Sequence, residues 1–470
     1  MQMVLPGEGD MLKIDYRFAM NGLIGANGLG KKQLAAALKK AQAALKDLKA
    51  RRDRGEVGFA TVLNDRAMVD SCAGLGKKYR GKLDNVVVLG IGGSALGPRA
   101  LAKALLPHPL LKNQGPRLLA CDNVDPEDLS EIFKIAFSGR SLFLAISKSG
   151  ATPETGSQLL YVVNRLKKNY GKKWKEHLLV ITDPEKGVLR KFADRHDLQS
   201  LPVPPKVGGR YSVLTPVGLA PAALLGIDPQ ELLRGATIID EIVFSGKHKP
   251  CAAELLAALY WAFAAKGRNM LVMMPYSSKL ADLSEWFAQL WAESLGKKFS
   301  LTGREVHAGT TPVRALGVTD QHSQLQLYLE GPSDKLVTFI KVEKFREHLD
   351  VPKAASGLEE LSWLSGHSFA ELINVEQFAT SASLARSGRP SITISIPRVD
   401  AYNLGALFYL FELVTVLVAS LWGVNPFDQP AVELGKQYTA SLLGRPGFED
   451  KERELDRFNK KASRFLWPRK

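Results

Sequence analysis

The chain is poor in cysteine, with three cysteines among 470 residues. Cys72, Cys121 and Cys251 lie far apart, and no two cysteines have the close spacing of a redox or zinc-binding motif. This pattern excludes a disulfide framework and argues against a thiolate metal site. Because free thiols persist in reducing compartments, we expect a cytoplasmic protein.

Metal-ligand patterns and targeting segments are also missing from the sequence. The eight histidines are scattered, without the HxH or HExxH spacing of common zinc sites. The N-terminus has no basic segment followed by an apolar one, so we expect no secretory signal. We therefore expect no metal cofactor.

Positive charge is in surplus but is not concentrated. The chain has 63 Lys and Arg against 48 Asp and Glu, a net charge of +15. Basic runs at 46–54, 165–175 and 451–470 have helical spacing or interleaved acids. None has the interleaved aromatic residues of an RNA-binding sheet. Solvated helix faces account for these runs, so we expect no nucleic-acid partner.

A single long hydrophobic run is present. Residues 404–424 are apolar except for Glu412, and the run is long enough to cross a bilayer. A charged residue near the centre of a span costs about 2.5–3.5 kcal/mol on insertion scales, and no second span follows. The run therefore favours a helix buried on all sides within a large domain, and we expect no membrane partner.

The first half of the chain alternates between apolar runs and helical segments. Such near-continuous apolar runs predict a parallel sheet that is covered on both faces. Helices are expected from Pro98 and from Pro153, and an Ala-rich amphipathic helix at 32–50 precedes them. The predicted strands are 85–89, 117–121, 141–146 and 177–182.

The same order of strand, Ser-containing turn and helix restarts at residues 269–274. Further strands are expected at 336–342 and 391–396. With 45% apolar and 24% charged residues, the chain is predicted to be an α/β protein with two doubly wound, mainly parallel-sheet domains. The expected limits are 1–55 for an N-terminal helical extension, 56–235 and 236–430 for the two domains, and 431–470 for a C-terminal helical segment.

A glycine-rich turn at 90–95 directly follows the first strand. Glycines let a backbone approach an anion, and the N–H groups at the start of the next helix favour negative charge. Two chemistries are open for this turn. The string binds an anionic group of a substrate, or it is the G-x-G-x-x-A turn of a dinucleotide site with Asp122 as the ribose-binding acid.

Residues 147–155, SKSGATPET, follow the third strand and offer several hydroxyls and one lysine at the mouth of a helix. Pro153 stands near the first helical position, as is common for proline. One Ser or Thr suffices to cap a helix, so the surplus of hydroxyls indicates more than a cap. Hydroxyls, backbone N–H groups and an ammonium together predict a cradle for a phosphate monoester.

Gln289 and Glu293 are four residues apart and share one face of the helix after residue 274. A surface ion pair between Glu293 and Lys297 is the structural alternative. The flanking tryptophans and leucine make this helix end largely apolar, which favours a partly desolvated carboxylate that moves protons from carbon.

Three further residues are weaker candidates when each is taken alone. His322 stands among uncharged polar residues at a helix start, with Asp320 as the expected cap. Arg210 follows two glycines in a tight turn, where an interdomain salt bridge is the alternative. Lys436 follows the long apolar helix and has the pattern of an ordinary helix lysine.

Six ordered blocks together resemble the glucose-6-phosphate isomerase (phosphoglucose isomerase) family. They cover most of the chain between residues 86 and 439, and their order is far more specific than any single block. In the family, the glycine turn lies beside a sugar phosphate, which disfavours the dinucleotide interpretation. The blocks are LGIGGSALGP, ISKSGATPET, GGRYSVLTPVGL, QLWAESLGK, TDQHSQLQLYLEGP and NPFDQPAVELGKQ.

The resemblance implies two flavodoxin-like sugar-isomerase domains, a homodimer, and an active site between domains near the subunit boundary. It implies that Glu293 shuttles a proton between carbons 1 and 2 through a cis-enediol, and that Arg210 stabilises the enediolate. His322, supplied by the other subunit, and Lys436 assist ring opening. The substrate-binding residues that it implies are Gly93, Ser94, Ser147, Lys148, Ser149, Thr152, Gln289 and Gln429.

The expected reaction is the reversible conversion of glucose 6-phosphate to fructose 6-phosphate. Ala151 stands where many family members have Thr, which removes one hydroxyl from the cradle. The alternatives are an isomerase that also accepts mannose 6-phosphate, a non-catalytic sugar-phosphate-binding regulator, and an NAD-dependent dehydrogenase.

Overall fold

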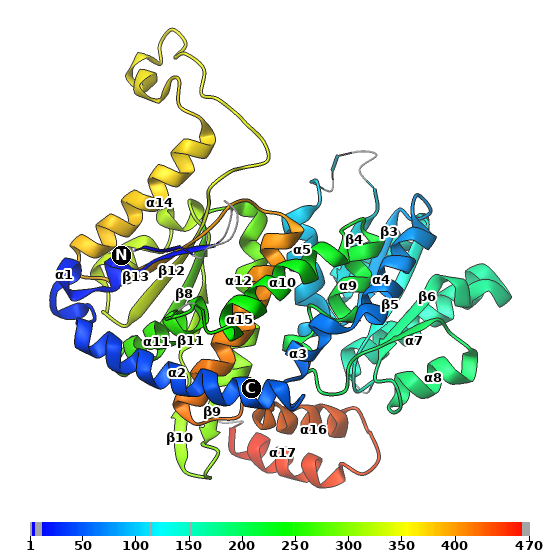
Figure 1. The fold of residues 1–470 in the computed structure, drawn as a ribbon. Helices are drawn as coiled ribbons and strands as arrows, with labels where there is room; N and C mark the ends of the chain where they lie inside the picture. Colours follow the sequence, from blue (N-terminus) through cyan, green and yellow to red (C-terminus); the bar gives the residue numbers. More distant parts are fainter. Residues whose placement is uncertain are drawn as a thin grey trace. The chain divides into compact units, whose positions relative to one another are not determined.

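The computed structural model describes residues 2–4, 12–108, 110–111, 115–150, 152–247 and 249–462 (Figure 1). The chain forms two compact units, Met1–Pro426 and Phe427–Lys470. The first unit contains both predicted sheets, and the second contains a pair of helices.

The first sheet is parallel throughout, with the strand order β4-β3-β5-β6-β7. The central strands are buried along their whole length, which explains their unbroken aliphatic sequences. The strands are β3 (Asn85–Leu89), β4 (Arg117–Cys121), β5 (Ser141–Ile146), β6 (Leu178–Thr182) and β7 (Ser200–Pro202).

Helices cover both faces of this sheet. On one face, apolar side chains of α6, α7 and α8 form a continuous core with the residues of β3, β5 and β6. On the other face, α9 contacts β3 and packs against α4 and α5. The helices are α4 (Arg66–Tyr79), α5 (Gly93–Leu105), α6 (Pro126–Ser138), α7 (Pro153–Tyr170), α8 (Val188–His196) and α9 (Pro216–Leu224).

The four strands predicted for this sheet are present, and three of them have the predicted limits. The fourth begins at Leu178 rather than at residue 177. The expected helix start at Pro98 is wrong: α5 begins at Gly93 and contains Pro98 in its interior. A proline lacks only its own N–H and disturbs the preceding turn, so it marks a helix start less reliably than the glycine turn does.

The second sheet has the order β1-β2-β13-β12-β8-β11. β11, β8, β12 and β13 are parallel, whereas β2 runs antiparallel to β13. Residues 1–55 thus contribute two strands to this sheet besides the predicted helix, now α2 (Lys31–Asp53). The strands are β1 (Gln2–Val4), β2 (Lys13–Asp15), β8 (Met270–Pro275), β11 (Thr311–Arg314), β12 (Lys335–Val342) and β13 (Ser391–Ile396), and a separate hairpin contains β9 (Lys297–Phe299) and β10 (Glu305–Ala308).

The two sheets are joined by a helical layer that contains α10 (Pro229–Phe244) and α15 (Ala401–Trp422). The two helices pack closely because glycines face backbone at both crossing points. A Cβ built at Gly235 would lie 1.8 Å from the Tyr402 carbonyl oxygen, and one at Gly405 would lie 1.8 Å from that of Leu232. α10 crosses the predicted domain limit at 235/236 without a break. The limit itself stays a prediction.

The long apolar run forms α15, the one helix among the described residues that is long and apolar enough to cross a membrane. Within its most apolar window, which has a mean hydropathy of 2.1, 89% of the residues are buried inside the protein. It contacts α2, α10, α11 (Ala252–Ala265) and α12 (Ala281–Leu295). This burial agrees with the predicted core helix.

Glu412 lies in the middle of α15 and is completely buried. Neither of its carboxylate oxygens has a hydrogen-bond partner in the described part of the chain. Burial holds the pKa of Glu412 well above its usual value, so the side chain folds as the neutral acid.

We expect a Glu412→Gln variant to be stabilised relative to the wild type as the pH rises. Above about pH 4.5 the unfolded chain releases the Glu412 proton and the folded chain keeps it, so stability falls by up to about 1.4 kcal/mol per pH unit. Glutamine has no such titration. Thermal unfolding at pH 5 and pH 8 measures the effect, with the exposed Glu241→Gln on α10 as control. An equal difference in Tm between variant and wild type at both pH values would contradict this prediction.

The C-terminal unit contains α16 (Glu433–Leu442) and α17 (Glu449–Ala462). The Tyr438 hydroxyl donates to the Glu454 carboxylate at 2.6 Å, and the Ser441 hydroxyl donates to the Phe448 carbonyl at 2.8 Å. The C-terminal segment is helical in α16 and α17, as predicted for residues 431–470.

Candidate active site

The candidate site is built at the point where the strand order of the first sheet reverses. β4 lies on one side of β3 and β5 on the other, so the loops after β3 and β5 leave the sheet in opposite directions. Ligands of open α/β sheets bind in the crevice at this point, beyond the carboxyl ends of the strands. The glycine turn follows β3, and the hydroxyl-rich loop follows β5.

The glycine turn lies in close contact with two other segments of the first unit. A Cβ built at Gly93 would lie 2.1 Å from the Gly209 carbonyl oxygen, which leaves no room for a side chain. Gly92 has φ +57°, and a Cβ there would lie 2.7 Å from Nε2 of Gln289. The start of α5, with Ser94 in its first turn, is thus held against both the Arg210 turn and α12.

The loop after β5 folds around the Ser147 hydroxyl. The Gly150 backbone N–H donates to Ser147 Oγ at 3.1 Å, and the hydroxyls of Ser147 and Thr152 lie 3.2 Å apart. Ser149 is exposed on the same loop. The structure therefore brings Ser147, Ser149 and Thr152 together at the start of α7, and Ala151 lies outside the described residues.

Lys148 turns from this loop toward the segment that precedes Arg210. Its ammonium donates to the Pro205 carbonyl and, at 2.9 Å, to the Val207 carbonyl. Burial lowers the pKa of Lys148 below its usual value, although nearby Asp183 opposes the shift. The lysine thus ties the hydroxyl-rich loop to the turn that carries Arg210.

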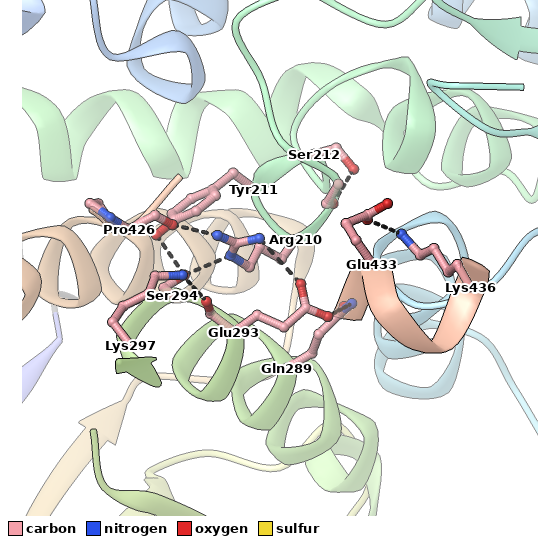
Figure 2. A network of polar contacts seen from close by, with 11 residues as sticks. Arg210, Tyr211, Ser212, Gln289, Glu293, Ser294, Lys297, Pro426, Glu433 and Lys436 are labelled. Atoms are coloured by element: carbon pink, nitrogen blue, oxygen red, sulfur yellow. Dashed lines mark hydrogen bonds and ion pairs between the residues drawn. The ribbon is translucent and has the colours of Figure 1, made fainter. Parts of the chain in front are cut away.

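Arg210 is the centre of the polar network in Figure 2. The residue is 4% exposed. Its Nε donates to Ser294 Oγ at 2.8 Å, Nη1 to Glu293 Oε2 at 3.2 Å and Nη2 to the Pro426 carbonyl at 2.5 Å. The guanidinium is fixed by the last turn of α12 and by the end of the first unit, so its positive charge is held beside Glu293.

Glu293 lies in the last turn of α12 with its side chain 34% exposed. Gln289, one turn earlier, donates from Nε2 to Glu293 Oε1 at 3.0 Å, as their four-residue spacing predicts. Figure 2 shows both side chains on the same face of the helix. Lys297 is buried, and its ammonium donates to the Glu293 backbone carbonyl at 2.7 Å.

The carboxylate of Glu293 therefore has one oxygen toward Arg210 and one toward Gln289. Its partial exposure leaves it accessible to a small molecule, whereas the guanidinium behind it is sealed from water. An acceptor of protons next to a fixed cation suits chemistry in which negative charge develops on a substrate oxygen.

The remaining predicted residues lie on other segments of the chain. His322 ends a short 3-10 helix, η7 (Thr319–His322), and its side chain is exposed. Asp320 does not cap a following α-helix: its carboxylate accepts from the Leu316 N–H at 2.7 Å and from the Ser323 hydroxyl. Gln429 and Lys436 belong to the C-terminal unit, where Lys436 Nζ donates to Glu433 Oε1 at 2.7 Å (Figure 2).

Sequence reasoning missed several members of the network. Ser294 accepts from Arg210 and lies 2.9 Å from the Tyr211 hydroxyl. Tyr211 is buried, and burial raises the pKa of its hydroxyl. Ser294 directly follows Glu293 in the sequence, and Tyr211 directly follows Arg210. This adjacency was the signal that could have identified them. The Pro426 carbonyl offered none, because backbone groups carry no residue-type signature.

The structure disfavours the dinucleotide alternative, because the acid that would bind the ribose already has another partner. Asp122 follows β4 as that pattern requires, but its carboxylate accepts a hydrogen bond from Arg99 at 2.7 Å. Among the described residues, no group of three His, Cys, Asp or Glu side chains is arranged to hold a metal ion.

Comparisons with known proteins show the family of the chain. A sequence model of the family described as phosphoglucose isomerase matches residues 66–460. A glucose-6-phosphate isomerase from Carboxydothermus hydrogenoformans is 42% identical over 464 residues, which cover 97% of this chain and 99% of that protein. One from Rubrobacter xylanophilus is 44% identical over 400 residues, which cover 83% of this chain and 90% of that protein.

Solved structures show the same fold. A hypothetical protein from Thermus thermophilus has a TM-score of 0.82 at 35% identity and covers 92% of this chain and 100% of that one. A glucose-6-phosphate isomerase from Chlamydia trachomatis has a TM-score of 0.79 at 22% identity, covering 95% of this chain and 91% of that one. The latter likeness concerns the fold.

The two mainly parallel sheets, with a carboxylate–guanidinium pair at the end of α12, place the chain among the α/β phosphosugar isomerases. The chain belongs to the phosphoglucose isomerase family, whose sequence model spans most of its length. Enzymes of this family interconvert glucose 6-phosphate and fructose 6-phosphate.

Proposed function

We propose that the chain catalyses this interconversion with Glu293 as the proton-transferring base. The observation that carries the proposal is the half-buried Glu293 carboxylate, held in place by Gln289 and Arg210. The base removes a proton from carbon 2 of the opened aldose and returns it to carbon 1 of the cis-enediol. Because both carbons are neighbours, one carboxylate serves both transfers.

Arg210 stabilises the negative oxygen of the enediolate in this proposal. Its charge is fixed by Ser294 and the Pro426 carbonyl before substrate arrives, so little reorganisation is needed when negative charge develops. The burial of the guanidinium strengthens the interaction, because a low local dielectric weakens electrostatic screening.

The loops after β3 and β5 hold the substrate phosphate. Ser147 and Thr152 already face each other at the start of α7, where the helix N-terminus favours an anion. We assign Gly93, Ser94, Lys148 and Ser149 to the same subsite. In the proposal, Lys148 exchanges one of its two backbone carbonyl partners for a phosphate oxygen.

Ring opening is assigned to His322 and Lys436, and contact with a sugar hydroxyl or water to Gln429. His322 is exposed at the end of η7, which suits a residue that completes the site of a second subunit. The assignment of Lys436 rests on the resemblance of the block that contains it.

A homodimer is part of this proposal. The segment between β12 and α14 (Phe369–Arg386) extends beyond the second sheet (Figure 1) and exposes large apolar side chains. An apolar surface of this kind favours burial against another chain. These side chains include Leu349, Leu358, Leu361 and Trp363 on the segment and Phe369, Val375 and Phe378 on α14. The three buried free cysteines suit a cytoplasmic enzyme.

A coupled assay tests the function. Fructose 6-phosphate is supplied with glucose-6-phosphate dehydrogenase and NADP, and NADPH formation is expected at nanomolar enzyme. Mannose 6-phosphate in the same assay, coupled through fructose 6-phosphate, distinguishes a dual-specificity enzyme. Absence of turnover at micromolar enzyme, together with binding of the sugar phosphate, would leave the regulator as the better description.

A further inference from the structure

We propose that Arg99 is a positioning residue that holds the phosphate-binding helix α5 in register with the base-bearing helix α12. The inference rests on the proposed function of the site and concerns how its two halves are kept at a fixed separation. Arg99 belongs to the first sheet's half of the chain, and its partners on α12 belong to the second.

The two helices pack side by side, each carrying one half of the site at one end. α5 begins at Gly93, beside the glycine turn, whereas α12 reaches the site at its C-terminal end with Gln289 and Glu293. Gly92 approaches Gln289, and seven residues later Arg99 approaches the first turns of α12. The helices therefore run antiparallel, with two points of contact along their length.

Arg99 joins three carboxylates from the two halves. Nη1 donates to Asp122 Oδ2 at 2.7 Å, and Nη2 donates to Glu285 Oε2 at 2.9 Å and lies 3.5 Å from Asp282 Oδ2. Arg314, at the end of β11, donates to the other oxygen of Glu285 at 2.7 Å. Arg99 is thus the cation that links the end of β4, through Asp122, to α12.

The exposed fractions indicate an ordered network rather than a mobile surface pair. The Arg99 side chain is 29% exposed, and its three carboxylate partners are 23–28% exposed. The planar guanidinium uses two of its nitrogens in different directions, a geometry that a lysine ammonium reproduces poorly. Sliding one helix along the other would break at least one of these contacts.

Two other cations attach α5 to the second half, but they bind only its C-terminal end. Lys279 donates to the Leu106 carbonyl at 2.6 Å, and Arg346 donates to the Ala104 carbonyl at 2.7 Å. Arg99 is closer to the site, since it follows Ser94 by five residues, about 7 Å along a helix. It is therefore the cation best placed to set the distance between the phosphate subsite and Glu293.

This role predicts that the loss of Arg99 affects the binding of different ligands to different extents. A ligand that occupies both the phosphate subsite and the enediolate position requires the correct separation, whereas inorganic phosphate requires only one subsite. A small misplacement of reacting groups lowers rates steeply. We therefore expect Arg99→Met to lower kcat and the affinity for 6-phosphogluconate, each by about tenfold, and to leave the affinity for inorganic phosphate within about twofold.

The experiment compares wild type, Arg99→Met, Arg99→Lys and the matched control Arg314→Met. Steady-state kinetics and calorimetric titration with 6-phosphogluconate and phosphate are measured well below each Tm. Arg99→Lys should recover part of kcat. Arg314→Met removes a neighbouring cation that donates to Glu285 from β11 rather than from α5, and it should remain near wild type. If Arg99→Met does not fold, Glu285→Gln tests the same link from α12.

Each outcome bears on one proposal. A lower Tm with unchanged kcat and unchanged 6-phosphogluconate affinity would overturn the positioning role and leave a purely structural ion pair. Equal losses for 6-phosphogluconate and for phosphate would also overturn it, because the damage would then lie in the phosphate subsite itself. A wild-type enzyme without turnover or 6-phosphogluconate binding would instead refute the proposed function.

Discussion

Replacing Glu293 with glutamine is expected to lower kcat by about 10³-fold while the protein stays folded. General base catalysis contributes roughly 10²–10⁴-fold, and glutamine cannot accept the carbon-bound proton. The change is nearly isosteric, so the amide oxygen can still accept from Arg210, and Gln289 can turn its own amide over to accept from the new NH2 group. The affinity for 6-phosphogluconate should therefore fall much less than kcat.

The direct measurement is proton exchange at carbon 2. Glucose 6-phosphate labelled with deuterium at carbon 2 is incubated with each enzyme, and loss of label is followed by NMR. The wild type should exchange label during turnover, and Glu293→Gln should not. The exposed Glu241→Gln serves as a control for loss of one carboxylate elsewhere. Exchange at the wild-type rate in Glu293→Gln would assign the base to another residue.

The second large effect is expected for Arg210→Met, which should lower kcat by about 10²-fold. Methionine fills part of the buried volume but removes the charge beside Glu293. It also takes away the donors to Ser294 Oγ, which keeps the Tyr211 hydroxyl as a partner, and to the Pro426 carbonyl. A buried acceptor left unpaired costs about 1–3 kcal/mol. Both activity and stability should therefore decline.

Arg210→Lys separates the two effects. A lysine keeps a positive charge but cannot direct separate donors to Glu293, Ser294 and the Pro426 carbonyl. We expect it to recover part of kcat and little of the lost stability, as measured by steady-state kinetics and thermal unfolding. If Arg210→Met loses stability and retains wild-type kcat and KM, then Arg210 is only an interdomain salt bridge, the alternative that the sequence left open.

The strands nearest the site were predictable because burial on both faces demands unbroken apolar sequence. β3 and β5 have the predicted limits for this reason. β2, β7 and β11 were not predicted, since strands of three or four residues at or near a sheet edge carry too little pattern. The predicted start of α5 at Pro98 is wrong because the helix begins within the glycine turn, at Gly93, and accommodates the proline in its interior.

The sequence by itself determined the local parts of this protein: the glycine turn, the hydroxyl-rich loop, and the i, i+4 pair of Gln289 and Glu293. Their chemistry follows from residue type and spacing, and the ordered blocks identify the family. Only the tertiary structure decided that Arg210 is buried against Glu293, that Lys148 bonds to carbonyls of the Arg210 turn, and that Arg99 joins α5 to α12. These contacts join residues 57–186 positions apart, and no local pattern encodes which distant groups meet.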